Sequence, residues 1–124
     1  MSTLNVSNIS DGTDTVGTGY VVNGSAKAWV NFNAGADVHD GQSFNVSSFT
    51  DVGTGNAQIN LINASASVYS PILACAGSSA SRNTQTENPP LSTASTIEVR
   101  TLATATGTLA DAGSNMIAMM GDLA

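Results

Sequence analysis

Lys27-Ala28-Trp29-Val30-Asn31-Phe32-Asn33 is the stretch that decides the fold, and it carries the only tryptophan of the chain. Side chains alternate between the two faces of a β-strand, so Val30 and Phe32 share one face while Trp29 shares the other with Asn31. Large apolar groups therefore stand on both faces. This pattern predicts a central strand, covered by a second sheet on one side and by a loop or a neighbouring subunit on the other.

Apolar and polar residues alternate along most of the remaining chain, which is typical of half-buried strands. The last apolar run contains several methionines and suits a helix by propensity, but its bracketing glycines favour a strand. Short strands separated by Gly, Asn and Asp turns predict an all-β fold, an antiparallel β-sandwich that is jelly-roll-like. Besides the Trp29 segment, strands are expected at residues 20–22, 43–50, 57–62, 66–76, 95–102 and 114–123.

Two local signals refine the strand prediction. Asn23-Gly24 suits the positive φ angles of a tight turn, so residues 20–22 are expected to form a hairpin with the Trp29 strand. Pro71 lacks a backbone N–H, which predicts that its strand lies at a sheet edge or contains a bulge.

The segment 77–92 differs from the rest of the chain. Almost all of its residues are small or polar, and it contains the sequence Asn88-Pro89-Pro90. Because such composition is typical of connections at the surface, an exposed loop is expected there.

The chain is expected to divide into a short N-terminal arm, residues 1–18, and one sandwich domain, residues 19–124. The arm is polar and strand-like, and terminal segments that no sheet holds tend to be mobile, so it is expected to become ordered against a partner subunit. The candidate assembly or interaction residues are Leu4, Val6, Ile9, Tyr20 and Trp29. For the two aromatic side chains a place in the core is favoured over an exposed binding role.

Composition restricts the partners. Of the 124 residues only 10% are charged, and nine acids against three bases give a net charge of −6. A polyanion would be repelled by this charge, which argues against nucleic acid and against an anionic membrane surface. No apolar run approaches the roughly 20 residues that span a bilayer, and the N-terminus lacks the features of a signal peptide, so the protein is expected to stay in the cytoplasm where it is made. With few aromatic residues the core is thin, which favours a homo-oligomer.

The sequence contains no legible catalytic site, and neither enzyme activity nor a cofactor or metal is expected. His39 with Asp37 and Asp40 offers cation ligands, but ordinary solvated side chains are favoured. Asp11-Gly12-Thr13-Asp14 resembles the start of a calcium loop without its downstream acids, so a plain turn is favoured. Cys75 lies in an apolar setting, where a buried structural cysteine is favoured over a reactive thiol.

Several of these segments together resemble a module found near the ends of tail fibres of tailed bacteriophages, over roughly Gly19 to Asp122. The Trp-Val-Asn-Phe-Asn element at 29–33 is the most specific part. The resemblance implies a β-rich module that serves virion structure or attachment, often as a trimer. It is carried by Lys27-Ala28-Trp29-Val30-Asn31-Phe32-Asn33, Ser43-Phe44-Asn45-Val46-Ser47-Ser48, Asp51 to Leu61, Ile97-Glu98-Val99-Arg100-Thr101, Gly107-Thr108-Leu109-Ala110-Asp111 and Gly121-Asp122.

Fibres carry a long shaft before this module, whereas this chain has a short arm. The leading prediction is therefore a bacteriophage virion protein that decorates or cements the outer capsid, assembled in the host cytoplasm with other virion proteins as a homo-oligomer, a trimer being favoured. The alternative is a tail-fibre or tail-tip adhesin that binds a host receptor through Trp29, Tyr20 or residues 77–92. A glycan-degrading enzyme is disfavoured because the acidic residues are scattered along the chain.

Overall fold

The computed structural model describes residues 2–33, 38–77 and 82–124, without the side chains of residues 38–41 and 87–92. Within these ranges the chain forms ten strands and one short helix. In order they are β1 (Asn8–Ser10), β2 (Thr15–Gly17), α1 (Thr18–Gly24), β3 (Ala28–Asn33), β4 (Val38–Phe44), β5 (Val46–Gly53), β6 (Asn56–Leu61), β7 (Ile72–Ala76), β8 (Arg82–Thr93), β9 (Thr96–Ala103) and β10 (Asn115–Met119).

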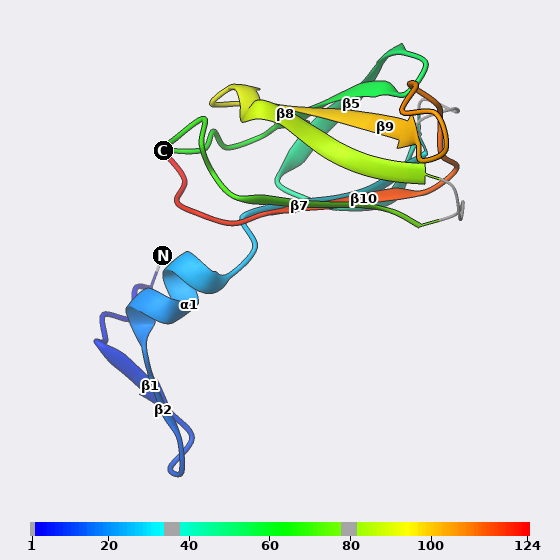
Figure 1. Ribbon diagram of the computed structural model, residues 1–124. Coiled ribbons are helices and arrows are strands. Elements are labelled where there is room, and N and C mark those ends of the chain that lie inside the picture. Colours follow the sequence, from blue (N-terminus) through cyan, green and yellow to red (C-terminus); the bar gives the residue numbers. More distant parts are fainter. Residues whose placement is uncertain (1, 34–37, 78–81) are drawn as a thin grey trace.

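The strands build two four-stranded antiparallel sheets, with the orders β4-β3-β10-β7 and β5-β6-β9-β8, and a separate hairpin of β1 and β2. Figure 1 shows the two larger sheets as the layers of a sandwich, with β7 and β10 in one layer and β5, β8 and β9 in the other. The predicted all-β fold with antiparallel sheets is thus confirmed, while the jelly-roll connectivity stays a prediction.

The core lies between the two sheets and follows from the alternation along each strand. In β3 every second side chain is buried, and β6 shows the same pattern in the facing sheet. Across the interface the rings of Phe32 and Phe49 lie 5.0 Å apart in a tilted arrangement. Apolar area removed from water stabilises a fold by roughly 25 cal/mol per Å², so this layer is the main source of stability. Its buried members are Ala28, Val30, Phe32, Ala57, Ile59, Leu61, Ile97, Val99, Ile117 and Met119.

The strand that contains Trp29 has the predicted place in the sheet. β3 pairs with β4 on one side and with β10 on the other, so it is an inner strand. Val30 and Phe32 point into the core, whereas Trp29 points to the opposite side and stays 39% exposed. In the described chain the second face of β3 therefore lies open to solvent.

The predicted hairpin of residues 20–22 with the Trp29 strand is wrong, because Tyr20 to Val22 belong to α1. Among the described strands none pairs with this segment, and the helix gives part of its backbone groups internal hydrogen-bond partners. Lys27 lies shortly after the end of α1, and its Nζ donates to the carbonyl oxygen of Val22 and to Ser25 Oγ. We call residues 2–24, which comprise the β1–β2 hairpin and α1, the N-terminal unit; it projects from the sandwich in Figure 1.

The predicted strand at 43–50 is divided between the two sheets. Asn45 has φ of 57° and lies between β4 and β5. An asparagine tolerates this left-handed conformation better than most residues. Its buried side chain accepts from the backbone N–H of Asn63 at 2.8 Å and donates to the Asn63 carbonyl at 3.1 Å. These bonds fix the corner at which the chain passes from one layer to the other.

The predicted exposed loop at 77–92 is wrong for its described part, since β8 spans Arg82–Thr93 and pairs with β9. Its register shifts between Thr86 and Leu91, where Pro89 and Pro90 cannot donate to the ladder. β8 is an edge strand of its sheet, a position at which proline is tolerated. Similarly, β7 forms an edge of the other sheet, which confirms the edge prediction, but it begins only after Pro71, so the predicted strand at 66–76 is wrong for residues 66–71.

Buried hydrogen bonds also connect the two layers. Asn115 on β10 is fully buried, and its Oδ1 accepts from Thr84 Oγ1 at 2.5 Å and from Thr101 Oγ1 at 3.2 Å. Its Nδ2 donates to the carbonyl of Ala112 at 3.1 Å. Because each of these polar groups has a partner, the cost of burying them is offset, and β10 is held in one position against β8 and β9.

The Gly107–Asp111 segment has a structural role. Asp111 Oδ1 accepts from the backbone N–H of Gly55 at 2.6 Å, and the Gly55 carbonyl accepts from Thr101 N at 2.7 Å. A Cβ added at Gly55 would lie 2.6 Å from both Ala110 N and Thr101 O. Only glycine fits this close approach at a φ of 70°. The acid at 111 thus anchors the β5–β6 turn.

Candidate functional site

The outer face of the β4-β3-β10-β7 sheet is apolar and exposed. The alternation that buries Val30 and Ile117 turns their neighbours Trp29 and Met116 outward. Leu73 on β7 is 65% exposed and Phe44 on β4 is 53% exposed. We call this surface the outer apolar face; it comprises Trp29, Asn31, Gln42, Phe44, Leu73, Cys75, Met116 and Ala118.

Strand register brings these side chains together from distant parts of the sequence. Trp29 is paired with Phe44 on one side and with Ala118 on the other, and Ala118 is paired with Leu73. Paired residues of antiparallel strands project from the same face, so these four form a row across the sheet. A second row contains Asn31, Met116 and Cys75, which are also register partners.

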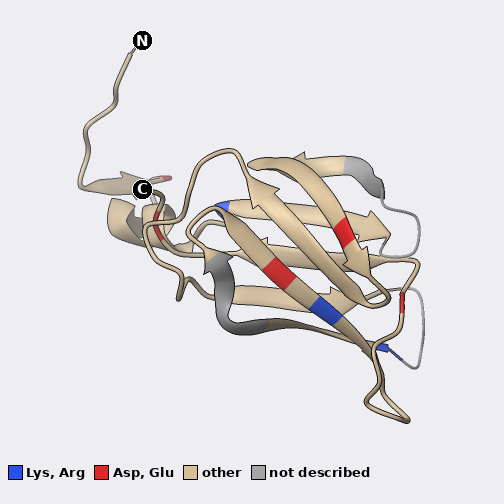
Figure 2. Cartoon of the chain, turned by 90° about the horizontal axis from the view of Figure 1, so that it is seen from above, with Lys and Arg blue, Asp and Glu red and all other residues tan. Residues whose placement is uncertain are grey.

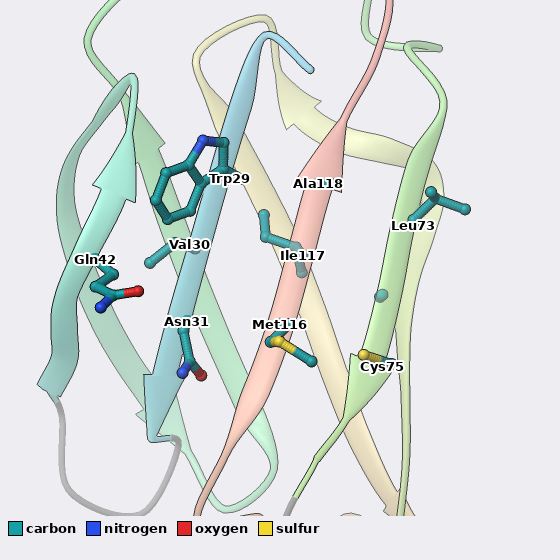
Figure 3. Close-up of a pocket in the computed structure, with 10 residues that line it drawn as sticks. Trp29, Val30, Asn31, Gln42, Leu73, Cys75, Met116, Ile117 and Ala118 are labelled. Carbon is teal, nitrogen blue, oxygen red and sulfur yellow. The ribbon is translucent and has the colours of Figure 1, made fainter. Parts of the chain in front are cut away.

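The rows border a shallow hollow of about 530 Å³. Figure 3 shows the indole of Trp29 and the amide groups of Asn31 and Gln42 on one side of it, and Leu73 and Cys75 on the other. None of the ten described residues that line it is charged. The chemistry available there is apolar contact and aromatic stacking, supplemented by two amide side chains.

The N-terminal unit is the second region with exposed apolar groups. Leu4 is 82% exposed and Tyr20 is 80% exposed, and α1 has no buried residue. Thr18 connects α1 to the segment before β1, because its backbone N–H donates to the Ser7 carbonyl at 2.9 Å and its Oγ1 donates to the carbonyls of Val6 at 3.0 Å and Ser7 at 3.1 Å. The unit is therefore internally connected but carries its apolar side chains on the outside.

The tip of the β1–β2 hairpin uses its acids for its own turn. Asp11 Oδ1 accepts from the backbone N–H groups of Thr13 and Asp14, both at 2.9 Å. These bonds, that from Asp14 first and that from Thr13 second, lower the pKa of the Asp11 carboxyl from its usual 3.8. The arrangement is that of a plain turn, the interpretation favoured from the sequence.

The structure separates the predicted interaction residues into two places. Leu4, Val6, Ile9 and Tyr20 lie in the N-terminal unit, and Trp29 lies on the outer apolar face. The prediction that both aromatic side chains are buried is wrong, because neither position faces the space between the sheets. The sequence analysis did not identify Phe44, Leu73 and Met116 as parts of one surface. In the sequence, each alternates with residues that face the core, which indicates that it points outward. This alternation shows that the three share a surface only once the strand pairing is known.

Cys75 is exposed on the outer apolar face, so the predicted buried position of this thiol is wrong. It stands on the outward phase of β7, between the half-buried Ala74 and Ala76.

Side chains that could hold a metal ion do not gather in the described ranges. These ranges contain no group of three or more His, Cys, Asp or Glu side chains placed to hold a metal ion. For His39, Asp37 and Asp40 the sequence left a choice between a cation site and ordinary solvated side chains. This choice lies outside what the structure describes, because Asp37 is not described and the other two lack described side chains. Among the described helices there is none with the length and apolarity to cross a membrane.

Comparisons with protein-family models, with curated proteins and with solved structures gave no match to this chain.

Proposed function

We propose that this protein is a structural component of a bacteriophage particle, a decoration or cement protein on the outer capsid. The observation that carries the proposal is the presence of two exposed apolar surfaces, the outer apolar face and the N-terminal unit, on one small chain. Exposed apolar patches of this kind mark sites of protein association. The resemblance of residues 19–122 to a phage fibre module gives the association its context.

A capsid-bound decoration protein suits the physical properties of the chain. Its net charge of −6 opposes adhesion to nucleic acid released from particles and to anionic host membranes. An all-β sandwich of jelly-roll type, assembled as a homotrimer, would use its apolar surfaces between its own copies and turn its remaining surface to the capsid. Catalysis has no part in this proposal.

The second candidate is a tail-tip or tail-fibre adhesin, and one observation favours it. The exposed indole of Trp29 shares a hollow with the amides of Asn31 and Gln42. An aromatic platform flanked by amides can stack on the apolar side of a sugar ring and bond its hydroxyl groups. A host surface glycan is the partner that this chemistry would recognise.

One experiment tests both candidates. Mass spectrometry of gradient-purified virions should find the protein in constant ratio to the major capsid protein, and absence from intact particles would overturn both. Imaging of virions labelled with an antibody against the chain then separates the candidates: many copies over the capsid support decoration, and a few copies at the tail support an adhesin. Virions from a phage that lacks this reading frame serve as the control for labelling.

A further inference from the structure

We infer that the N-terminal unit of one copy docks on the outer apolar face of a second copy of this chain. The occupant of the face is thus residues 2–24 of a neighbour, and the contact builds the homo-oligomer. The inference deepens the proposed function by naming the partner at its assembly surface, but its test needs only the purified protein.

The N-terminal unit lacks a core of its own. β1 and β2 have three residues each, and α1 has seven. A lone two-stranded hairpin is marginal in water, and helices shorter than about 12 residues are marginal without tertiary packing. The unit nevertheless exposes seven large apolar side chains: Leu4, Val6, Ile9, Val16, Tyr20, Val21 and Val22. Such a unit requires an apolar surface to cover it.

Charge restricts the surfaces through which two copies can meet. Two copies that each carry −6 repel one another, so they can meet closely only where charges are absent. The described residues that line the hollow on the outer apolar face are uncharged. In the N-terminal unit the charged residues are Asp11 and Asp14, both at the hairpin tip, whereas residues 2–10 and α1 carry none. In their described parts, the lining of the hollow and residues 2–10 with α1 are therefore matched in being neutral on a strongly acidic protein.

The apolar area on the two surfaces suits a contact between copies. An aromatic side chain presents about 150–250 Å², so the exposed parts of the four large side chains on the face offer on the order of 400 Å². One docked unit then buries about 800 Å² over both partners, which is half of the roughly 1,600 Å² of a standard stable interface. A closed assembly, in which every unit and every face is used, supplies two such contacts per copy. The large apolar side chains on the face are Trp29, Phe44, Leu73 and Met116.

The arrangement in space agrees with a contact between copies. Figure 1 shows the N-terminal unit projecting away from the layer that contains β7 and β10, on the side of its outer surface. Lys27 N donates to the Met119 carbonyl at 2.7 Å, which fixes the point where the chain enters the sandwich. A unit held out from one sheet in this way is available to the same sheet of a neighbour, and repetition of the contact closes a dimer or a ring.

The first test is the mass of the full chain, measured by light scattering after size exclusion and by analytical ultracentrifugation over a range of concentrations. We expect a dimer or trimer for the unaltered protein. Leu4→Glu and Leu73→Glu place a charge on either side of the contact and should each raise the dissociation constant at least about tenfold, because burying an unpaired charge is costly. Val52→Glu, at an exposed apolar residue on the other sheet, is the matched control and should change nothing.

A monomer at all concentrations would overturn the inference, as would an oligomer that survives both Leu4→Glu and Leu73→Glu. The three altered positions are largely exposed, at 82%, 65% and 57%, so each variant is expected to fold, and circular dichroism confirms this before the masses are compared.

A second test shows which surfaces meet. Cys75 is the only cysteine and stands on the outer apolar face. In the Leu4→Cys variant, oxidised glutathione should join the new thiol to Cys75 of a neighbour, giving covalent dimers or trimers on a non-reducing gel. Val52→Cys is the control and should give none. A bond formed within one chain would overturn the inference in favour of intramolecular docking. Assembly in solution without presence in virions would leave this inference standing and remove the proposed function.

Discussion

The two outer faces of the sandwich are built by the same strand alternation but differ in chemistry. On the β5-β6-β9-β8 sheet, Gln58 donates from Nε2 to Glu98 Oε1 at 2.9 Å, and Asn60 links Ser48 to Thr96. Figure 2, viewed from above, shows acidic and basic positions on the strands of this sheet. On the β4-β3-β10-β7 sheet the outward positions hold Trp29, Phe44, Leu73 and Met116.

The difference shows which surface is complete without a partner. Polar side chains in a hydrogen-bonded ladder keep contact with water, so the polar outer face has no need of cover. The opposite face leaves four large apolar groups in water, which costs free energy that association would recover. Sequence alternation alone makes both faces; only the identity of the outward residues distinguishes a solvent surface from an interface.

The largest effect is expected from breaking the layer that both faces share. Phe32→Ala removes a fully buried ring that contacts Phe49 and should lower the free energy of unfolding by about 3–5 kcal/mol. Trp29→Ala, on the other side of β3, should lower the stability of the monomer by less than about 1 kcal/mol. Urea unfolding at a concentration below that of association measures both. Equal losses for the two variants would contradict the assignment of Trp29 to an open face.

A smaller loss is expected when the link between the two sheets is cut. Asn115→Ala leaves the hydroxyl groups of Thr84 and Thr101 without their acceptor and should cost about 1–3 kcal/mol. The double variant with Thr84→Val should lose less than the sum of the two single variants, because one orphaned hydroxyl is then absent. Thermal unfolding of the three variants supplies the cycle. Full additivity would show that these groups do not act as one network.

Strands with a regular alternation of apolar and polar residues were predicted correctly from the sequence. The prediction was wrong where pairing with a neighbouring strand, rather than the local pattern, determines the structure. The segments at 57–62 and 95–102 are strands close to their predicted limits, since each reports its own burial pattern. Residues 82–92 were predicted as part of a loop because most of their side chains are small or polar, yet they belong to β8, which pairs with β9, and Thr84 is buried against Asn115. The composition of a segment does not show which strand it will pair with.

The same limit applies to the candidate site. Trp29 and the N-terminal apolar residues were identified, because they stand out in a polar chain. Leu73 on β7 and Met116 on β10 are 43 residues apart in the sequence, and they share a surface only because these two strands pair in the folded sheet. The helix at 18–24 was missed for a related reason: no available sheet edge reaches Tyr20 to Val22, and their β propensity is overridden.

Substitutions on the outer face of the β5-β6-β9-β8 sheet should lower the free energy of unfolding less than substitutions in the core or at Asn115. Glu98→Ala removes the acceptor of the Gln58 amide, which is half-buried and can turn to water, so a loss of about 0.5–1 kcal/mol is expected. Glu98→Gln keeps an acceptor oxygen and should lose less. Chemical denaturation distinguishes the two, and oligomer mass should be unchanged in both. A shift in mass would show that this face also takes part in association.

The smallest effect concerns the tip of the N-terminal unit and depends on pH. Hydrogen bonds from Asp14 N and Thr13 N favour the ionised Asp11 carboxylate and lower its pKa from 3.8. The turn is therefore stabilised at pH values above 3.8, and this contribution is lost as the pH falls through the lowered pKa of the folded chain. Carboxyl chemical shifts followed by NMR should show Asp11 titrating below 3.8, and Asp11→Asn should remove most of the pH dependence of the Thr13 amide signal. The hairpin tip holds both charged residues of the N-terminal unit, Asp11 and Asp14. If the contact between copies is made by residues 2–10 and α1, the mass of the oligomer should stay constant over this pH range. Dissociation that follows the titration of Asp11 would instead place the hairpin tip inside the interface.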